Sequence, residues 1–440
     1  MPASLFANLW PSVSTRGAAA CADSDNHAAS RRQLPNEIWG EIAHFSLRND
    51  VLNLRASSNA LKQEADRAVT VLRLNGSANI SAFATANCFP YIRSLNLYGA
   101  DNDSLLLLAR RLAAFPREHL RITLMSRQGS ISEALIAIAA LPLASLLVHR
   151  FHQASDNGLA ALSACRYPLE LTGNLTREAL VTASRLATLT TLCSEALGFD
   201  DHVAASYAAH PALKFLLLHA NSRLSSRGVA SIAAMPALRD LVLYNADELA
   251  APLDVMAASA LAANRTLESL YIETGASCLH APSFAALSGS QTLKLLRISI
   301  CENMHQIEGM RGLQCLMLSG KGEACPVLTP TAAHAIVNLP HLRFLTVRFA
   351  RCEPQSLRLL FSPSSITNMY VRGTHVTPDA IAAIIANTRL SALKLDDAGL
   401  SPEDIRTLSY HPNLMTLTVD GVTIKRPSRE TIIAPVDHVI

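Results

Sequence analysis

The chain has few aromatic and few charged residues. Only 5% of its 440 residues are Phe, Trp or Tyr and 17% are Asp, Glu, Lys or Arg, whereas 50% are hydrophobic, and the formal net charge is +3. A nearly neutral chain lacks the clustered basic charge that a dedicated nucleic-acid-binding protein needs. Because so much apolar surface can be buried, the composition also excludes a globally disordered chain.

The sequence contains no Cys-x-x-Cys pair. Its nine cysteines are scattered singly, and their number is odd. This usage argues against a disulfide scaffold and is typical of a reducing compartment, in which thiols are buried as small hydrophobic groups. Zinc sites need paired ligands at close spacing, and none are present. We therefore expect neither a metal nor another cofactor.

Long apolar runs are also missing. The longest, Ala134 to Val148, has 15 residues and contains Pro142, which is short of the roughly 20 residues that cross a bilayer. Residues 1–30 lack the basic start of a secretory signal peptide, and Pro11 breaks their apolar run. We interpret this Ser/Ala-rich segment as a flexible leader and as a candidate signal for another secretion route.

A repeat organises residues 71–424. The pattern L-x-x-L-x-L recurs in about 15 units, for example LRDLVL, LESLYI, LRFLTV and LSALKL, with LATLTTL at 186–192 as a weak member whose third anchor we place at Thr191. The intervals between third anchors run from 20 to 29 residues. L-x-L alternation predicts a short strand with one leucine face, and the apolar segments between the strands have helical periodicity.

Three of these helical segments carry start signals. Thr329-Pro330, Thr377-Pro378 and Ser401-Pro402 each place a hydroxyl residue before a proline. A hydroxyl at the N-cap and proline at the first helical position both favour helix initiation. A strand and a helix of this size cannot bury their apolar faces alone, so stacked units predict a solenoid.

This pattern resembles the leucine-rich repeat family. The resemblance implies an α/β solenoid, a horseshoe with short parallel strands on its concave face and helices on its convex face. The family's usual Asn after the last strand Leu is present only at Asn174 and Asn221, so we expect irregular units. Residues 425–440 are interpreted as a C-terminal tail or cap.

The segment 31–70 carries a second pattern, LPNEIWGEIAHFSLRNDVLNLRASS from Leu34 onward. Ile38, Ile42 and Phe45 form one apolar helical stripe, and three short helices are expected. The segment resembles the F-box, a small three-helix module that docks on Skp1-like adaptors of cullin ubiquitin ligases. The adaptor-contact residues that this resemblance implies are Leu34, Pro35, Glu37, Ile38, Ile42, Phe45, Leu47, Asp50, Leu52, Leu54 and Arg55. The alternative is a helical cap over the first repeat.

An F-box followed by Ala-rich repeats resembles the GALA-type type III effectors of plant-pathogenic bacteria, and NGLAALSAC at 157–165 and RGVASIAAM at 227–235 look like degenerate forms of their repeated helix. The resemblance implies a virulence protein secreted by a bacterial type III system into the host cytoplasm, with the host nucleus as a further destination. The alternative is a eukaryotic cytoplasmic or nuclear receptor of the same architecture.

Side chains that alternate with the buried leucines are expected on the concave face. Tyr and Arg are the residue types that most often anchor protein interfaces. The candidate binding residues for a target protein are Tyr244, Tyr271, Arg297, Arg348, Tyr370 and Arg372.

Catalytic motifs are scarce. The sequence has no Walker loop, no HExxH and no GxSxG, and Cys21-Ala22-Asp23, which resembles the catalytic motif of bacterial ubiquitin ligases with leucine-rich repeats, lies in the leader without room for that family's helical domain. We therefore expect a non-catalytic adaptor that binds a Skp1-like adaptor and cullin complex at one end and a target protein on the repeats, and neither nucleic acid nor membrane. The alternatives are a repeat scaffold or inhibitor without ligase coupling, and a ligase with its own cysteine.

Overall fold

The computed structural model describes residues 70–85, 92–114, 118–125, 131–149, 156–194, 198–218, 224–244, 253–272, 279–301, 303–320 and 327–425. The chain divides into two units, Met1–Ala68 and Val69–Ile440, and every described residue belongs to the second. The leader, the expected F-box helices and the eleven expected adaptor-contact residues from Leu34 to Arg55 lie outside the described residues.

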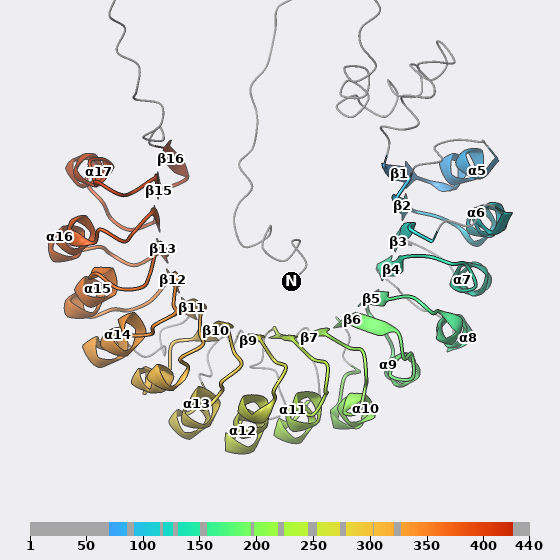
Figure 1. Cartoon of the computed structure of the whole chain (residues 1–440), viewed down its shortest axis with the longest axis horizontal. Coiled ribbons are helices and arrows are strands. Elements are labelled where there is room, and N and C mark those ends of the chain that lie inside the picture. Colours follow the sequence, from blue (N-terminus) through green and yellow to red (C-terminus); the bar gives the residue numbers. More distant parts are fainter. Residues whose placement is uncertain are drawn as a thin grey trace, which may run out of the picture. The chain divides into compact units, whose positions relative to one another are not determined.

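The described residues of the second unit form one sheet of 16 strands, which follow one another across the sheet in sequence order (Figure 1). Each of the first 15 pairs in parallel with its neighbour. The strands are β1 Val71–Asn75, β2 Ser94–Tyr98, β3 Arg121–Met125, β4 Ser145–His149, β5 Leu169–Gly173, β6 Leu189–Ser194, β7 Phe215–Leu218, β8 Asp240–Leu243, β9 Ser269–Ile272, β10 Leu295–Ser299, β11 Cys315–Ser319, β12 Phe344–Arg348, β13 Asn368–Arg372, β14 Ala392–Asp396, β15 Thr416–Val419 and β16 Val422–Lys425.

Helices connect successive strands and line one side of the sheet (Figure 1). They are α5 Ser77–Thr85, α6 Asn102–Ala114, α7 Ser132–Ala139, α8 Asp156–Ala161, η1 Leu162–Ala164, α9 Arg177–Ala183, α10 Asp201–Tyr207, α11 Ser226–Ala233, α12 Val255–Ala263, α13 Ala281–Ser288, η3 Met304–Gly309, α14 Pro330–Val337, α15 Pro354–Phe361, α16 Pro378–Ala386 and α17 Pro402–Ser409. The 3-10 helix η3 takes the place of an α-helix in the short interval between Ile298 and Leu318.

The core lies between the sheet and the helices. The leucine anchors of the strands point into it, as at Leu95 and Leu97, and they meet apolar helix residues such as Leu105 and Leu108, all of which are buried. The strand–helix repeat and its leucine core confirm the expected α/β leucine-rich-repeat solenoid. The hydrophobic contribution is spread over many similar layers, because each unit packs mainly on its neighbours.

The three predicted helix starts are confirmed. Thr329 accepts a hydrogen bond from the amide of Ala332 at 3.3 Å, and Thr377 accepts one from Ala380 at 3.4 Å. Ser401 forms a capping box with Asp404, in which each side chain accepts a hydrogen bond from the other residue's backbone amide. The hydroxyls thus satisfy amides that the first helical turn leaves without partners.

The weak unit departs from the predicted frame. Pairing between β5 and β6 is interrupted, with Leu169 opposite Leu189 but Glu170 opposite Thr191. From β6 onward the buried anchors are Leu192 and Ser194, which pair with Leu216 and Leu218. The predicted third anchor, Thr191, is therefore wrong. Ser194 occupies a buried position that is aliphatic in most units, and β6 has one extra residue that shifts the register. Because of both changes, the correct frame of the L-x-x-L-x-L pattern is not recognisable in this unit.

The last strand closes the sheet at its C-terminal end. β16 runs antiparallel to β15 after a two-residue turn made of Asp420 and Gly421, both of which have positive φ. Positive φ at both central residues is what a tight hairpin turn of this kind requires. The hairpin covers the edge of β15, which would otherwise present unpaired backbone groups.

Candidate functional site on the inner strand face

One face of the sheet packs against the helices, and we call the opposite face the inner face. The residue between the two buried anchors of each strand points to it, since side chains alternate along a strand. The register aligns these residues side by side in one row across consecutive strands. From β8 to β14 the row contains Val242, Tyr271, Arg297, Met317, Thr346, Tyr370 and Lys394.

The six candidate residues fall into two clusters on this face. The first cluster contains Tyr271 of β9, Arg297 of β10, and Tyr244, which directly follows β8. Arg348, Tyr370 and Arg372 belong to β12 and β13. Strand β11 lies between the two groups, and its inner-face residue is Met317. The structure thus places the six candidate residues in two neighbouring groups of three.

The first cluster is built around a buried tyrosine. Tyr271 is 8% exposed, and the guanidinium carbon of Arg297 lies 4.0 Å from the centre of its ring. The ring of Tyr244 lies 5.0 Å from that of Tyr271, at an interplanar angle of 59°. These are the distances of a cation–π contact and of a tilted aromatic pair.

Apolar side chains extend this cluster toward β7. Phe215 and Val242 pack with Tyr271, and Leu217 and Cys193 lie against them. Sequence reasoning missed this extension. In FLLL and LVL every position is apolar, so alternation does not reveal which residues face inward, and only the cross-strand register does.

The second cluster surrounds Tyr370. This tyrosine is 7% exposed. The guanidinium carbon of Arg348 lies 5.1 Å from its ring centre, and the ammonium nitrogen of Lys394 lies 4.7 Å from it. Its hydroxyl donates to Asp396 at 2.9 Å, and Lys394 pairs with the same carboxylate at 3.0 Å. Burial, and then the hydrogen bond to Asp396, raises the pKa of the Tyr370 hydroxyl.

Beside the second cluster lies an aromatic side chain that the sequence analysis did not single out. Phe349 directly follows β12, is 44% exposed and has a φ of 51°. The guanidinium of Arg372 lies 5.3 Å from its ring centre, and Arg372 also pairs with Asp397 at 3.4 Å. The L-x-x-L-x-L pattern does not indicate where Phe349 points, because this residue lies just after the strand.

The six candidate residues differ in how open they are to a partner. Tyr271 and Tyr370 are buried beneath neighbouring cationic side chains. Arg372, Phe349 and Phe344 are exposed on or beside the inner face. Long side chains on adjacent strands are close enough to cover a ring between them.

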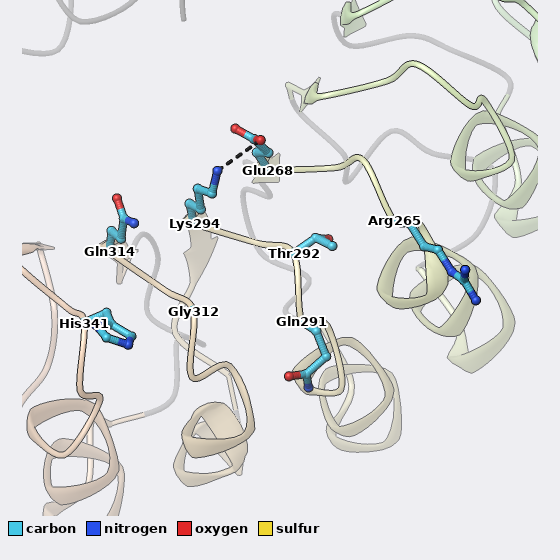
Figure 2. Close-up of a pocket in the computed structure, with 8 residues that line it drawn as sticks. All are labelled: Arg265, Glu268, Gln291, Thr292, Lys294, Gly312, Gln314 and His341. Carbon is cyan, nitrogen blue, oxygen red and sulfur yellow. Dashed lines mark ion pairs between the residues drawn. The ribbon is translucent and has the colours of Figure 1, made fainter.

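A shallow cavity of about 390 Å³ lies at the edge of the sheet where chain segments enter β9–β12 (Figure 2). Glu268 and Lys294 form an ion pair of 3.0 Å within it. Its lining comes from four consecutive units, and most of the lining residues are of polar types: Arg265, Glu268, Gln291, Thr292, Lys294, Gly312, Gln314 and His341. Figure 2 shows that Arg265 and Lys294 point in different directions, so these cations do not converge on one point.

The described ranges lack both a metal-binding cluster and a membrane-spanning helix. These residues contain no group of three or more His, Cys, Asp or Glu side chains placed to hold a metal ion. No helix among them has the length and apolar character that crossing a bilayer requires.

No known family model matches the chain, and no curated protein matches it significantly. Among solved structures, an internalin from Listeria monocytogenes is similar to it, with 14% sequence identity, a TM-score of 0.35, and coverage of 89% of this chain and 94% of the internalin chain. The assignment of the fold rests on the strands, helices and register described above.

Proposed function

We propose that this chain is a non-catalytic receptor that holds a target protein on the inner face of its repeats. The observation that carries this proposal is the grouping of aromatic and arginine side chains on β8–β10 and β12–β13. Aromatic residues and arginines supply most of the binding energy in protein interfaces. Parallel strands in one rigid sheet hold these side chains in fixed relative positions without a cost of ordering a loop.

We further propose that residues 31–70 couple this receptor to a Skp1-like adaptor and cullin complex. This part rests on the resemblance of the segment from Leu34 to Arg55 to the F-box. Holding a target near a ubiquitin-loaded enzyme raises its effective concentration, so no chemistry is required of the repeats. The Ala-rich helices at 157–165 and 227–235 favour a type III effector that acts inside a host cell.

Co-precipitation of the full chain with a purified Skp1-type adaptor tests the coupling. We expect binding that is lost when Leu34→Ala and Pro35→Ala are combined, because both residues belong to the docking motif. Arg372→Ala, which changes only the inner face, is the matched control and should leave adaptor binding intact.

Two other results would redirect the assignment. Absence of adaptor binding by the unmodified chain favours the alternative, a repeat scaffold or inhibitor whose residues 34–68 cap the first unit. Ubiquitin chains formed in a mixture that lacks cullin indicate a ligase with its own cysteine.

A further inference from the structure

Strand β12 presents two exposed aromatic side chains, one at each end. Phe344, its first residue, and Phe349, the residue after its last, are each 44% exposed. Among the phenylalanines in the described ranges, these are the two that are exposed. Five residues of extended chain span roughly 16 Å, so the two rings mark the ends of a surface that runs along one strand.

Phe349 is held in a conformation that a bulky residue adopts only at a cost. Its φ of 51° lies in the left-handed region, which is unfavourable for side chains other than glycine. The corresponding position after β13 is Gly373 and after β14 is Asp397. The amide of Phe349 donates to the carbonyl of Arg372 at 2.6 Å, which fixes this backbone conformation.

Two glycines make room for Phe349. A Cβ on Gly373 would overlap the Phe349 ring, and a Cβ on Gly320 would overlap its carbonyl oxygen. The neighbouring units thus accommodate a ring that remains nearly half exposed. A phenylalanine that adds strain and leaves nearly half of its surface exposed contributes less to the core than a buried one, which points to a role in contacting another molecule.

Arginines stand next to both phenylalanines in the sequence, and the guanidinium of Arg372 lies 5.3 Å from the Phe349 ring centre. Arg343 precedes Phe344 and is exposed, and Arg348 precedes Phe349. The Nε atom of Arg348 is buried and has no hydrogen-bond partner among the residues that the structure describes. Arg372 pairs with Asp397, but both side chains are largely exposed at 45% and 65%, and such pairs exchange partners at little cost.

A second carboxylate, Asp396, is engaged through its Oδ2 atom by groups of this protein. Asp396 accepts from Tyr370 and pairs with Lys394. The Asp420 carboxylate accepts from the amide of Asp397 at 2.8 Å and belongs to the same region. Four cationic residues, Arg343, Arg348, Arg372 and Lys394, stand against the three carboxylates Asp396, Asp397 and Asp420, which leaves one net positive charge. A partner segment with carboxylates beside its apolar groups is therefore complementary to it.

We propose that Phe344, Arg348, Phe349 and Arg372 form the primary contact for an extended, acidic segment of the target protein, whose apolar side chains cover the two rings. This proposal rests on the proposed function and specifies which part of the inner face binds and what chemistry it selects. The segment lies along β12, so its two apolar contacts are separated by about five residues of extended chain.

Selection of random 12-residue peptides displayed on phage, with the immobilised full chain as bait, tests this proposal. We expect enriched peptides that combine Asp or Glu with two apolar residues. A synthetic copy of an enriched peptide should bind the Phe349→Gly variant at least 10-fold more weakly than the unmodified chain. Tyr410→Ala removes an aromatic side chain that is 73% exposed elsewhere and should leave binding unchanged.

The Phe349→Gly variant also separates contact from structure. Glycine relieves the left-handed strain, so the thermal midpoint should stay the same or rise while peptide binding falls. A lowered midpoint together with unchanged binding would show that Phe349 is structural, and it would overturn the proposal. Enrichment of basic peptides, or no enrichment, would also overturn it.

A photo-crosslinkable copy of the peptide distinguishes binding at β12 from the more general proposal that the target binds somewhere on the inner face. Crosslinks to β12 and β13 support the proposed contact. Crosslinks confined to β8–β10 overturn it but leave target binding on the inner face in place, whereas crosslinks to the helical side overturn both.

Discussion

The guanidinium of Arg297 covers the ring of Tyr271, with 4.0 Å between the guanidinium carbon and the ring centre. The two residues occupy directly paired positions on β9 and β10. A cationic side chain on one unit thus closes over an aromatic side chain of the unit before it. The contact joins consecutive units on the inner face, in addition to the leucine layers on the opposite face of the sheet.

Replacement of Arg297 by alanine should uncover Tyr271 and remove this cation–π contact. We expect a loss of about 0.5–1 kcal/mol, the usual value for such contacts near a surface. Because repeat arrays open locally, amide hydrogen exchange in β9 and β10 is the appropriate measurement. Arg297→Lys keeps the charge but loses planar stacking and should give an intermediate effect; equal exchange in all three proteins would contradict the prediction.

Gly373→Ala should destabilise the units around β12–β14. The new Cβ would overlap the Phe349 ring, and alanine is disfavoured at a φ of 61°. The double variant with Phe349→Ala should recover the part of the loss that comes from overlap but retain the backbone cost. Chemical denaturation of the four proteins in a double-mutant cycle gives the coupling, and strict additivity would show that the ring and the glycine do not interact.

Stability should fall in mildly acidic solution because of His210. Its Nδ1 atom accepts from the amide of Leu213 at 3.1 Å, and its Nε2 atom lies 3.0 Å from the carbonyl oxygen of Leu186. Burial lowers the pKa of this imidazole below its ordinary value. As the pH falls below about 6.5, the unfolded chain therefore binds the proton first, and folding free energy is lost. Above that pH the contribution of His210 is fully present.

The chain itself supplies the control for this pH effect. Asn264 stands three residues before Leu267, as His210 stands before Leu213, and it makes the equivalent bonds: Oδ1 accepts from Leu267 at 2.7 Å, and Nδ2 donates to Met235 at 3.2 Å. His210→Asn should therefore fold normally and flatten the decline of the thermal midpoint between pH 7 and pH 5. An unchanged pH profile would exclude His210 as its source.

Ser401→Ala should loosen α17 more than Thr377→Ala loosens α16. The Ser401 hydroxyl accepts from the amide of Asp404 at 3.2 Å and also donates to the Asp404 carboxylate at 2.7 Å, whereas Thr377 makes only the first kind of bond. Loss of an N-cap costs about 1 kcal/mol. In α17 only Leu408 is buried, so tertiary packing compensates little. Protease cleavage within α17 should accelerate several-fold, and equal rates for both variants would contradict this account.

Much of the fold was predictable because its signals are local or periodic. Leucine spacing predicts which residues enter the core, as Leu95 and Leu97 do, and Thr-Pro or Ser-Pro pairs predict where helices start. The turn at Asp420-Gly421 also has a local signal, since Asp-Gly favours a tight hairpin, although the strand after it was not anticipated. The register shift at β6 was not predictable from the sequence. Ser194 is polar and so does not look like a core position, and the extra residue is evident only from the strand pairing.

The candidate site was predictable only by residue type. Alternation indicates that Tyr271, Arg297, Tyr370 and Arg372 face inward. It does not indicate that arginine and lysine side chains cover both tyrosines, because that depends on which strands pair and in what register. The adaptor contacts expected between Leu34 and Arg55 stay a prediction.

The sequence alone therefore determined the leucine-rich repeat, its parallel strand–helix order and the composition of its inner face, because each follows from spacing along the chain. The tertiary structure decided which of those side chains remain exposed and where Phe349 lies, because exposure is set by neighbours that are 20 to 29 residues apart in sequence and adjacent only across the sheet.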